Sequence, residues 1–337
     1  MNIHRRQILK VTASFAAGMA MSSLPGFAQG AKRTWDMSDE YNLTGMTGQV
    51  STFFVNEMKK RVGDELEIVY HGGKTLGFRS VDHFDAVQDN SVPLAITQTS
   101  QLGGQNALFE LTSIPFLVKD LNEARLLWKI SKPEFAKLFE DNDMIVLFAV
   151  PNAPNGVHSK VPLETVASLK GLRLRTYDAI GTKTFAAAGV SPLQIAFGDL
   201  IPQLSTNGID AVLSSAEAGV QLSLWDYLNT FTALNYVMPL FMAHANKDAY
   251  GELSQKARDA FQDVSALTDD YAWTLVNESI ESSYTKLEAH KYRVVRTASP
   301  EVLAALQKAG EQTKADWLQK MGDRGTKILA AFDAAKA

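Results

Sequence analysis

Cysteine is absent from the sequence. The chain can therefore form no disulfide and use no cysteine nucleophile, and no lipid-modified cysteine can tether it to a membrane. Long apolar runs and low-complexity tracts are absent as well, and the balance of 46% hydrophobic and 21% charged residues is typical of a globular protein. These absences predict a fold that depends on ordinary core packing.

Several motifs of enzyme chemistry are missing too. There is no Gly-x-Ser-x-Gly elbow, no phosphate loop ending in Gly-Lys-Ser/Thr and no Gly-x-Gly-x-x-Gly turn. The histidines after the amino-terminal segment show no i, i+4 pair and no clustered ligand spacing. They are His71, His83, His158, His244 and His290. We therefore expect no metal site and no cofactor, and catalysis is disfavoured without being excluded.

The first 30 residues carry positive charge and no acid. They include the stretch RRQILK, a modest apolar segment, and small residues at Gly26 and Ala28. This pattern is typical of a secretory signal peptide, residues 1–28, cleaved near Ala28, and RRQILK is similar to a twin-arginine signal. A membrane anchor is the weaker alternative, because residues 8–24 are too short and too often interrupted by polar residues to span a bilayer.

Removal of residues 1–28 makes the chain more acidic. The segment carries three positive charges and no negative one, so the formal net charge changes from −4 to −7. Nucleic-acid-binding proteins usually present basic surfaces, so nucleic acid is not expected as a partner. The signal and the missing lipid anchor predict a protein that diffuses in the periplasm.

Hydrophobic periodicity predicts alternating strands and helices. The first half is predicted as strand 33–38, helix 47–63, strand 65–73, helix 80–90, strand 92–100, helices within 121–140 and strand 144–150. The second half is predicted as strand 172–176, helix 180–188 stopped by Gly189, strand 193–196, a helix within 199–207 between Asp199 and Gly208, and strand 209–215. A chain of 337 residues suits two domains of roughly 150 residues. We predict an α/β protein with two lobes, each a mixed, mostly parallel sheet flanked by helices.

The residue pattern of the carboxyl-terminal third of the sequence predicts a long helix that connects the two lobes. After a return strand at 237–245, residues 250–291 have helical spacing and no glycine or proline beyond Gly251. One helix of that length would measure about 60 Å at 1.5 Å per residue and would span both lobes, although two kinked helices would also fit. A short strand at 292–297 and a helix starting at Pro300 are expected to return to the second lobe. The predicted lobes comprise residues 29–152 with about 240–275, and residues 153–239 with about 276–337.

The stretch SLKGLRLRTYD, residues 168–178, places an arginine where a strand ends. Ligands of parallel α/β sheets lie beyond the carboxyl ends of strands, and Arg175 lies at such an end. Its planar fork matches a carboxylate, whereas an unpaired guanidinium deep in a sheet would be costly. Arg175 is therefore a candidate for binding an organic acid. The alternative is that it pairs with Asp178 or another acid and serves stability alone.

Other strand ends carry small polar residues, and aromatic residues lie near them in sequence. The polar candidates are Ser38, Thr97, Gln98, Asn155, Ser214 and Ser215. The aromatic candidates are Tyr41, Phe78, Phe197 and Trp225. Apolar walls with a few placed polar groups are typical of a small-molecule pocket, although each aromatic residue alone fits the core equally well.

Three segments resemble the solute-receptor subunits of TRAP (tripartite ATP-independent periplasmic) transporters, the DctP family. They are LGFRSVDHFDAVQDNSVPLAI, ELTSIPFLV and the long segment from Leu169 to Asp210, which contains the LRLR strand. The resemblance implies a periplasmic-binding-protein-like fold with a long helix across both lobes. It also implies a receptor that closes on an organic acid and hands it to integral membrane TRAP permease subunits.

The resemblance also assigns binding residues. The family's carboxylate-binding arginine corresponds to Arg175 and its pocket aromatic residue to Phe197. Further pocket positions correspond to the loop at 38–42, to Phe78 and Arg79, and to Thr97 and Gln98. Asn155 stands where some members have a second arginine, and Ser214 lies where the family often has Glu-Asn-Pro, so a sialic acid is not expected. One firm cation among neutral and aromatic neighbours predicts a monocarboxylate rather than a C4 dicarboxylate.

Two other functions remain open from the sequence. A receptor that feeds an ATP-driven importer would have a similar pocket but usually no helix across both lobes. A periplasmic enzyme acting on organic acids would need a base, for which His158 is the least unfavourable candidate because it follows the crossing between the predicted lobes.

Overall fold

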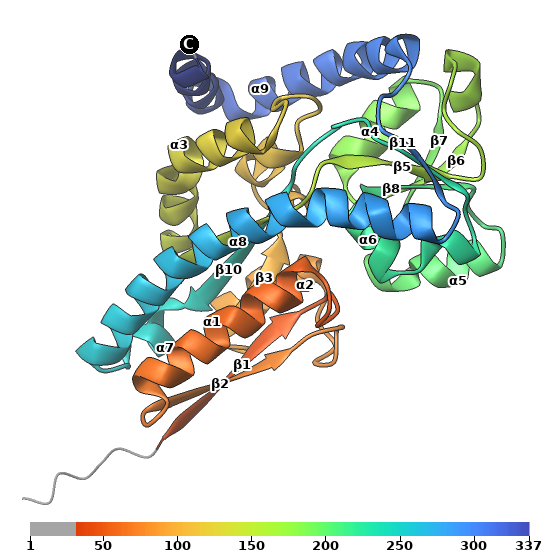
Figure 1. Cartoon of the computed structure of the whole chain (residues 1–337). Coiled ribbons are helices and arrows are strands. Elements are labelled where there is room, and N and C mark those ends of the chain that lie inside the picture. Colours follow the sequence, from red (N-terminus) through yellow and green to blue (C-terminus); the bar gives the residue numbers. More distant parts are fainter. Residues whose placement is uncertain (1–31, 337) are drawn as a thin grey trace, which may run out of the picture. The chain divides into compact units, whose positions relative to one another are not determined.

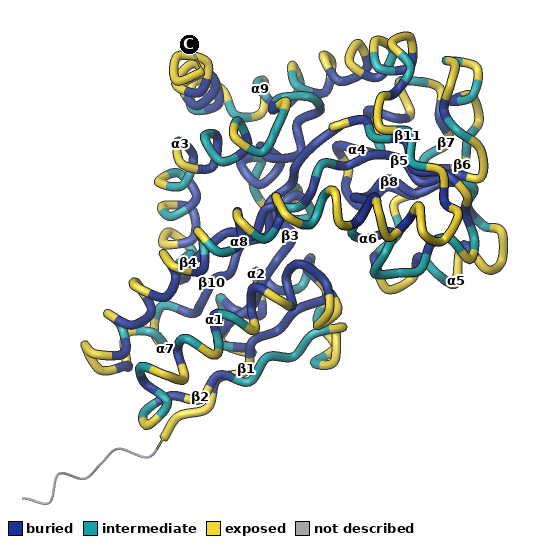
Figure 2. The backbone as a smooth tube through the Cα atoms, in the orientation of Figure 1, coloured by how far each residue is buried: buried dark blue, intermediate teal, exposed yellow. Residues whose placement is uncertain are grey.

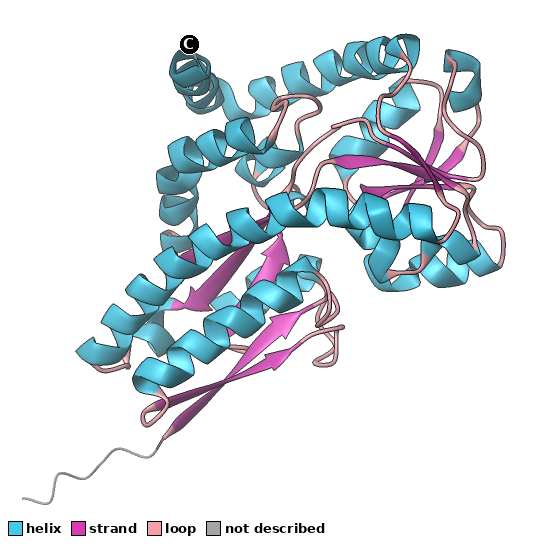
Figure 3. Cartoon of the chain, viewed as in Figure 1, coloured by secondary structure: helices cyan, strands magenta, loops and turns pink. Residues whose placement is uncertain are grey.

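Two β-sheets organise the chain in the computed structural model, which describes residues 32–336 (Figures 1 and 3). The predicted signal peptide, residues 1–28 with cleavage near Ala28, lies outside these residues. In spatial order the first sheet contains β2 (Leu66–His71), β1 (Arg33–Asp39), β3 (Leu94–Gln98), β10 (Leu240–Asn246) and β4 (Met144–Pro151). β1 is parallel to β2 and β3, and β10 is antiparallel to both of its neighbours. The prediction of a mixed, mostly parallel sheet is confirmed.

The second sheet has the same character. In spatial order it contains β11 (Arg293–Val295), β9 (Thr230–Thr232), β5 (Asn155–Ser159), β8 (Ala211–Ser215), β6 (Arg173–Thr176) and β7 (Ser191–Gln194). Only β5 is antiparallel to its neighbours within the described residues. The sequence did not predict β5 or β9, because strands of five and three residues give little alternation. Gly156 in β5 permits the close approach of β9, since a Cβ there would lie 2.2 Å from the Thr232 carbonyl oxygen.

Helices cover both faces of the first sheet, because side chains along each strand point alternately to opposite faces. On one face Trp35 and Phe148 pack against Phe261 and Phe54, at ring distances of 5.5 and 4.9 Å. His244 lies on the other face, 4.9 Å from the ring of Phe139. These contacts come from α1 (Met46–Val62), α8 (Gln255–Ala289) and α3 (Leu121–Glu140), and α2 (Ser80–Gln88) packs beside β3. The buried residues follow the two sheets, and exposed residues lie on the outer sides of the helices (Figure 2).

The second sheet is covered by α4 (Ala179–Ala187), α5 (Leu200–Ser205) and α6 (Ala216–Gln221). Asp178 caps α4 by accepting the Gly181 N–H at 2.7 Å. The prediction that Asp199 caps the next helix is wrong, because Asp199 has helical dihedral angles and its side chain caps nothing. Gly208 does not end that helix either, since Asn207 takes the left-handed conformation, with φ 55°.

Two long helices connect the lobes. α8 is unbroken over 35 residues, with Phe261 in the core of the first lobe and Leu287 in that of the second, which confirms one helix across both. Figure 1 shows it passing along both sheets. α9 (Pro300–Lys336) starts in the second core with Leu306 and, around a kink at Gly322, ends in the first core with Phe332. The structure thus places the last turns of α9 beside the first lobe, whereas the sequence predicts that they return to the second.

The chain crosses between the sheets at residues 152–154 and again at 233–239. The two crossings lie side by side: the Asn152 N–H donates to the Pro239 carbonyl and the Asn155 N–H to the Val237 carbonyl, both at 2.9 Å. Each crossing leads into the antiparallel strand of the sheet that it enters, β5 or β10. Paired extended segments of this kind can serve as a hinge.

The remaining elements are short helical turns. They are η1 (Thr99–Leu102), η2 (Ala107–Ser113), η3 (Val166–Leu169), η4 (Phe197–Asp199), η5 (Leu224–Asp226) and α7 (Lys247–Gly251). Across residues 32–336, none of the helices combines the length and the apolar character that crossing a bilayer requires.

Candidate functional site

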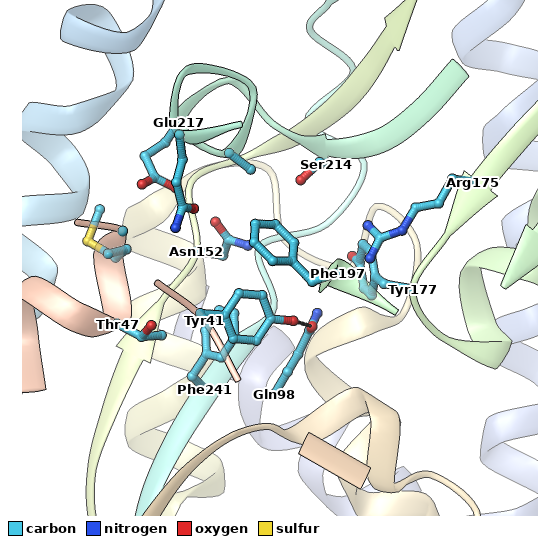
Figure 4. A pocket seen from close by; sticks show the side chains of 14 residues that line it. Tyr41, Thr47, Gln98, Asn152, Arg175, Tyr177, Phe197, Ser214, Glu217 and Phe241 are labelled. Carbon is cyan, nitrogen blue, oxygen red and sulfur yellow. Dashed lines mark hydrogen bonds between the residues drawn. The ribbon is translucent and has the colours of Figure 1, made fainter. Parts of the chain in front are cut away.

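A pocket lies between the two sheets, where the carboxyl ends of their strands meet (Figure 4). About 460 Å³ of space there is free of protein atoms, part of it open to solvent. The first lobe contributes residues at the end of β1, the start of α1, the end of β3 and the start of β10. The second lobe contributes residues from β6, η4, β8 and α6. The lining residues are Tyr41, Gly45, Met46, Thr47, Gln98, Asn152, Arg175, Tyr177, Phe197, Ser214, Glu217, Ala218, Gln221 and Phe241.

Arg175 is a buried cation without an acidic partner. Only 2% of the residue is exposed, and within the described part of the chain no carboxylate oxygen lies within 4.0 Å of its guanidinium. Its Nε donates to the Ile195 carbonyl at 2.9 Å and its Nη1 to the Leu213 carbonyl at 3.4 Å, whereas Nη2 has no hydrogen-bond partner among residues 32–336. Burial lowers the pKa of Arg175 from its ordinary value. A buried guanidinium with a free donor favours binding of an anion.

The alternative pairing of Arg175 with Asp178 is not found. The Oδ1 atom of Asp178 instead caps α4 by accepting the Gly181 N–H. Burial raises the pKa of Asp178. Figure 4 shows the guanidinium pointing from β6 into the pocket, beside Tyr177. The guanidinium carbon lies 5.6 Å from the centre of the Tyr177 ring, a distance that allows a cation–π contact.

Three aromatic residues form the apolar wall. The Tyr41 ring lies 4.8 Å from that of Phe197 and 4.9 Å from that of Phe241. Phe197 follows β7 in the second sheet, yet it packs with the core of the first lobe. The Tyr41 hydroxyl donates to Gln98 Oε1, and Gln101 Nε2 donates to the same oxygen at 2.9 Å. The lobes therefore touch across the pocket through the rings of Tyr41 and Phe197, and hydrogen bonds hold the Gln98 amide beside this contact.

Glu217 supplies the second charge among the lining residues. It lies on α6, on the side of the pocket opposite Arg175 in Figure 4. Burial raises the pKa of Glu217 to about 7, although the Met46 N–H and the charge of Lys286 lower it. Among residues 32–336 no basic side chain lies within 4.0 Å of its carboxylate. The pocket thus has an unpaired cation on one side and an unpaired acid on the other.

The structure brings five of the predicted site candidates together. Arg175, Phe197, Ser214, Gln98 and Tyr41 all line the pocket. Asn155 lies one layer behind, where its Nδ2 donates to the Tyr177 hydroxyl at 2.7 Å. It can therefore orient Tyr177 without facing a ligand.

Five other predicted residues lie away from the pocket. Ser38 and Thr97 point into the core of the first lobe and contact His83 at 3.0 and 3.1 Å. Arg79 pairs at the surface with Asp82 at 3.1 Å. Phe78 packs half-buried against the first core, and Trp225 stacks on His290 at 3.8 Å. The prediction placed Thr97 and Gln98 together, but successive side chains of a strand face opposite ways, so only Gln98 reaches the pocket.

The sequence reasoning missed several lining residues. Tyr177 lies two positions after Arg175, and Asn152 lies in the crossing between the sheets, so both could have been found from the predicted strand ends. Glu217 and Gln221 lie in the first turns of a helix that the sequence did not predict. Met46 and Thr47 begin α1, whose start was predicted within one residue, and the signal was its position in the loop that follows the first strand.

His158 has no access to the pocket. Its Nε2 lies 2.9 Å from the Ser215 carbonyl and its Nδ1 lies 3.1 Å from the Tyr292 hydroxyl, so the neutral ring donates to the carbonyl and accepts from the hydroxyl. Burial lowers the pKa of His158 to about 4. In the part of the chain that the structure describes, no three His, Asp or Glu side chains gather in a way that could hold a metal ion.

Two lobes joined by paired crossings, with a buried guanidinium in the pocket between them, form the architecture of a ligand-binding receptor. The chain belongs to the family of bacterial extracellular solute-binding proteins, family 7 (DctP), whose model matches residues 41–331. Members of this family are extracytoplasmic solute receptors, and the predictions of family, fold and receptor function are confirmed.

Three relatives illustrate the similarity. The 2,3-diketo-L-gulonate-binding periplasmic protein YiaO of Escherichia coli (strain K12) is 23% identical over 79% of this chain and 81% of its own length. The structure of DctP7, a Bordetella pertussis extracytoplasmic solute receptor binding pyroglutamic acid, is 28% identical, with a TM-score of 0.86 over 89% of this chain and 99% of that one. The structure of a marine metagenome TRAP solute-binding protein specific for pyroglutamate is 25% identical, with a TM-score of 0.86 over 90% of this chain and 99% of that one.

Proposed function

We propose that this protein is the periplasmic receptor of a TRAP transporter, that it binds a small monocarboxylic acid between its lobes, and that it delivers this acid to the membrane permease. The observation that carries the proposal is the free Nη2 donor of the buried Arg175. The signal peptide, cleaved near Ala28, would direct the chain to the periplasm.

Arg175 is the single cation among the pocket-lining residues that the structure describes. A dicarboxylate would place a second negative charge among neutral groups and Glu217, where no cation could compensate it. The two pyroglutamate-binding structures described above are the most informative for ligand choice, because pyroglutamate has one carboxylate. We therefore propose pyroglutamate as the first candidate ligand.

The binding energy cannot come from Arg175 alone. A hydrogen bond to a charged group contributes roughly 1.5 to 3 kcal/mol, whereas micromolar affinity requires about 8 kcal/mol. The remainder comes from burial of the ligand against Tyr41, Phe197 and Phe241 and from closure of the lobes around it. In this scheme Arg175 selects an acid, and the walls select which acid.

The test is the substitution Arg175→Lys, which keeps the charge but removes the planar fork. We expect L-pyroglutamate to bind the variant at least about tenfold more weakly in calorimetry, as loss of one charged hydrogen bond requires. Arg173→Lys is the matched control, because Arg173 lies on the same strand but pairs at the surface with Asp210 at 2.7 Å. It should bind like the wild type.

A panel of organic acids completes the test. The wild-type unfolding temperature should rise with monocarboxylates, since a ligand that binds only the folded state stabilises it. Unchanged affinity of Arg175→Lys, or a panel in which no acid stabilises the wild type, would contradict the proposal.

A further inference from the structure

Glu217 is a carboxylate held inside the contact between the lobes. It belongs to α6 of the second lobe and lines the ligand pocket together with Met46 and Thr47 of α1 in the first lobe. The packing there is close, since a Cβ on Gly45 would lie 2.6 Å from Gln221 Nε2. Glu217 also lines a neighbouring cavity that reaches Lys286 on α8. It therefore forms part of the wall between the ligand pocket and the outside.

The groups that face Glu217 compensate its charge only in part. The Met46 N–H and the charge of Lys286 favour the ionised form, but Lys286 is too distant for an ion pair within the described residues. Burial acts in the opposite direction and brings the pKa to about 7. A partly buried acid without an ion-pair partner costs free energy, and the fully buried, unpaired guanidinium of Arg175 on the other side of the same pocket costs more.

The remaining polar groups of the lining are neutral. They are Tyr41, Thr47, Gln98, Asn152, Tyr177, Ser214 and Gln221. A ligand that compensates both unpaired charges must be dipolar, with an acceptor that is negative at Arg175 and a hydrogen-bond donor at Glu217. A second carboxylate at that end would meet the Glu217 carboxylate, and two like charges in a buried site repel strongly.

We propose that Glu217 determines which acids this receptor accepts: the pocket takes a monocarboxylate that also offers an N–H or O–H donor to Glu217, and it excludes dicarboxylates. This inference rests on the proposed function, because it takes the ligand's carboxylate to bind Arg175. It adds a recognition element on the side of the pocket opposite Arg175 and assigns it to α6.

Three acids of similar size separate the contribution of the N–H donor from the effect of a second carboxylate. L-Pyroglutamate has one carboxylate and a ring N–H. The matching enantiomer of 3-oxocyclopentanecarboxylate has a CH₂ in place of that N–H, and glutarate has a second carboxylate. Calorimetry at pH 8, above the pKa of Glu217, compares the three with the wild type and with Glu217→Gln.

For the wild type we expect pyroglutamate to bind at least about tenfold more tightly than the carbocyclic analogue, because the analogue leaves Glu217 without its donor. Glutarate should bind more weakly still. In Glu217→Gln the preference for the N–H should fall to about threefold or less, and the affinity for glutarate should rise. Glu278→Gln is the matched control, since Glu278 lines the neighbouring cavity but not the ligand pocket, and it should keep the wild-type preferences.

The outcomes distinguish this inference from the proposed function. If Arg175→Lys weakens all three acids but Glu217→Gln leaves their ratios unchanged, the receptor function stands and the role of Glu217 is refuted. Equal wild-type affinity for pyroglutamate and its carbocyclic analogue refutes it as well, and that comparison requires no variant to fold. A wild type that binds no acid refutes both.

Discussion

Arg173 and Arg175 lie two positions apart on β6, in opposite environments. Arg173 is exposed and forms two hydrogen bonds with Asp210, at 2.7 and 2.8 Å. Arg175 is buried and, among the described residues, forms hydrogen bonds with carbonyl oxygens only and lies beside the Tyr177 ring. A surface ion pair contributes little to stability, whereas a buried unpaired guanidinium costs folding free energy that an anion can offset. The strand therefore carries one arginine at its solvent end and one at its pocket end.

Phe197 permits a test of the contact across the pocket. Replacing it with alanine removes its ring contact with Tyr41, and we expect ligand affinity to fall at least about tenfold, since an aromatic pair adds about 0.5–1.5 kcal/mol beyond the area that it buries. The unfolding temperature without ligand should fall as well, because Phe197 is also buried against the core of the first lobe. Calorimetry and thermal unfolding measure the two effects.

The matched control for Phe197→Ala is Phe185→Leu. Phe185 is fully buried in the core of the second lobe, 5.1 Å from the Tyr236 ring. Its substitution should lower the unfolding temperature and leave the affinity close to that of the wild type. A Phe197 variant that unfolds early but binds normally would show that Phe197 serves the core alone.

The sequence could predict the residues of the pocket that end a strand, but not those whose direction depends on strand register. Arg175, Gln98 and Ser214 follow from the rule that ligands lie beyond strand ends. The prediction that Thr97 lines the pocket did not match the structure, because the neighbouring Gln98 faces the pocket and successive side chains of a strand face opposite ways. Which of the two faces the pocket depends on the register of β3 with its neighbours. Glu217 was not predicted as a pocket residue, because a carboxylate on a helix is usually exposed to solvent and only the fold brings the opposite lobe against it.

At the scale of elements, two buried histidines join α2, β3 and β10. His83 contacts Ser38 and Thr97, and the Thr97 hydroxyl lies 2.9 Å from His244 Nε2. Burial lowers the pKa of His83 to about 4 and that of His244 to about 3. The neutral rings therefore stabilise the fold above about pH 6.5, and this contribution is lost as the pH falls from 6.5 toward 4.

The substitution His83→Gln should reduce this acid sensitivity. The wild type should lose about 3 kcal/mol more unfolding free energy than the variant between pH 7 and pH 4, since one pKa unit corresponds to about 1.4 kcal/mol. The comparison between variants is needed because burial also raises the pKa of Asp39 to about 7, which makes stability fall as the pH rises toward 7. Urea unfolding at several pH values measures the difference.

Ser38→Ala is the control for this experiment. It removes a hydrogen-bond partner of His83 but leaves both histidines, so it should lower stability at every pH without changing the slope. A His83→Gln variant with the wild-type slope would show that His83 does not become charged on acid unfolding.

At the scale of the whole molecule, the connections between the lobes determine what can move. The two crossings at 152–154 and 233–239 are bonded to each other, and α8 runs beside both sheets. The lobes also meet through α9, through Phe116 and Tyr236, and around the pocket through Tyr41 and Phe197 and through Gly45 and Gln221. Rotation about the crossings would open the pocket while each sheet stays intact. The sequence predicted the crossings and the long helix, but the contacts between the lobes depend on side chains that only the fold brings together.

Closure can be measured directly, because the absence of cysteine allows two introduced cysteines to be labelled selectively. Leu43 and Leu193 suit this purpose, since their side chains are exposed, at 58% and 43%, and lie on different lobes. With spin labels at Leu43→Cys and Leu193→Cys, saturating acid should shift the distance distribution toward shorter and narrower values, because the ligand favours the closed population. In the labelled protein that also carries Arg175→Lys, the same acid concentration should leave the distance distribution as it is without ligand. Identical distributions with and without bound acid would show that the ligand enters a pocket that is already closed, and the energy assigned to lobe closure would then have to come from the walls alone.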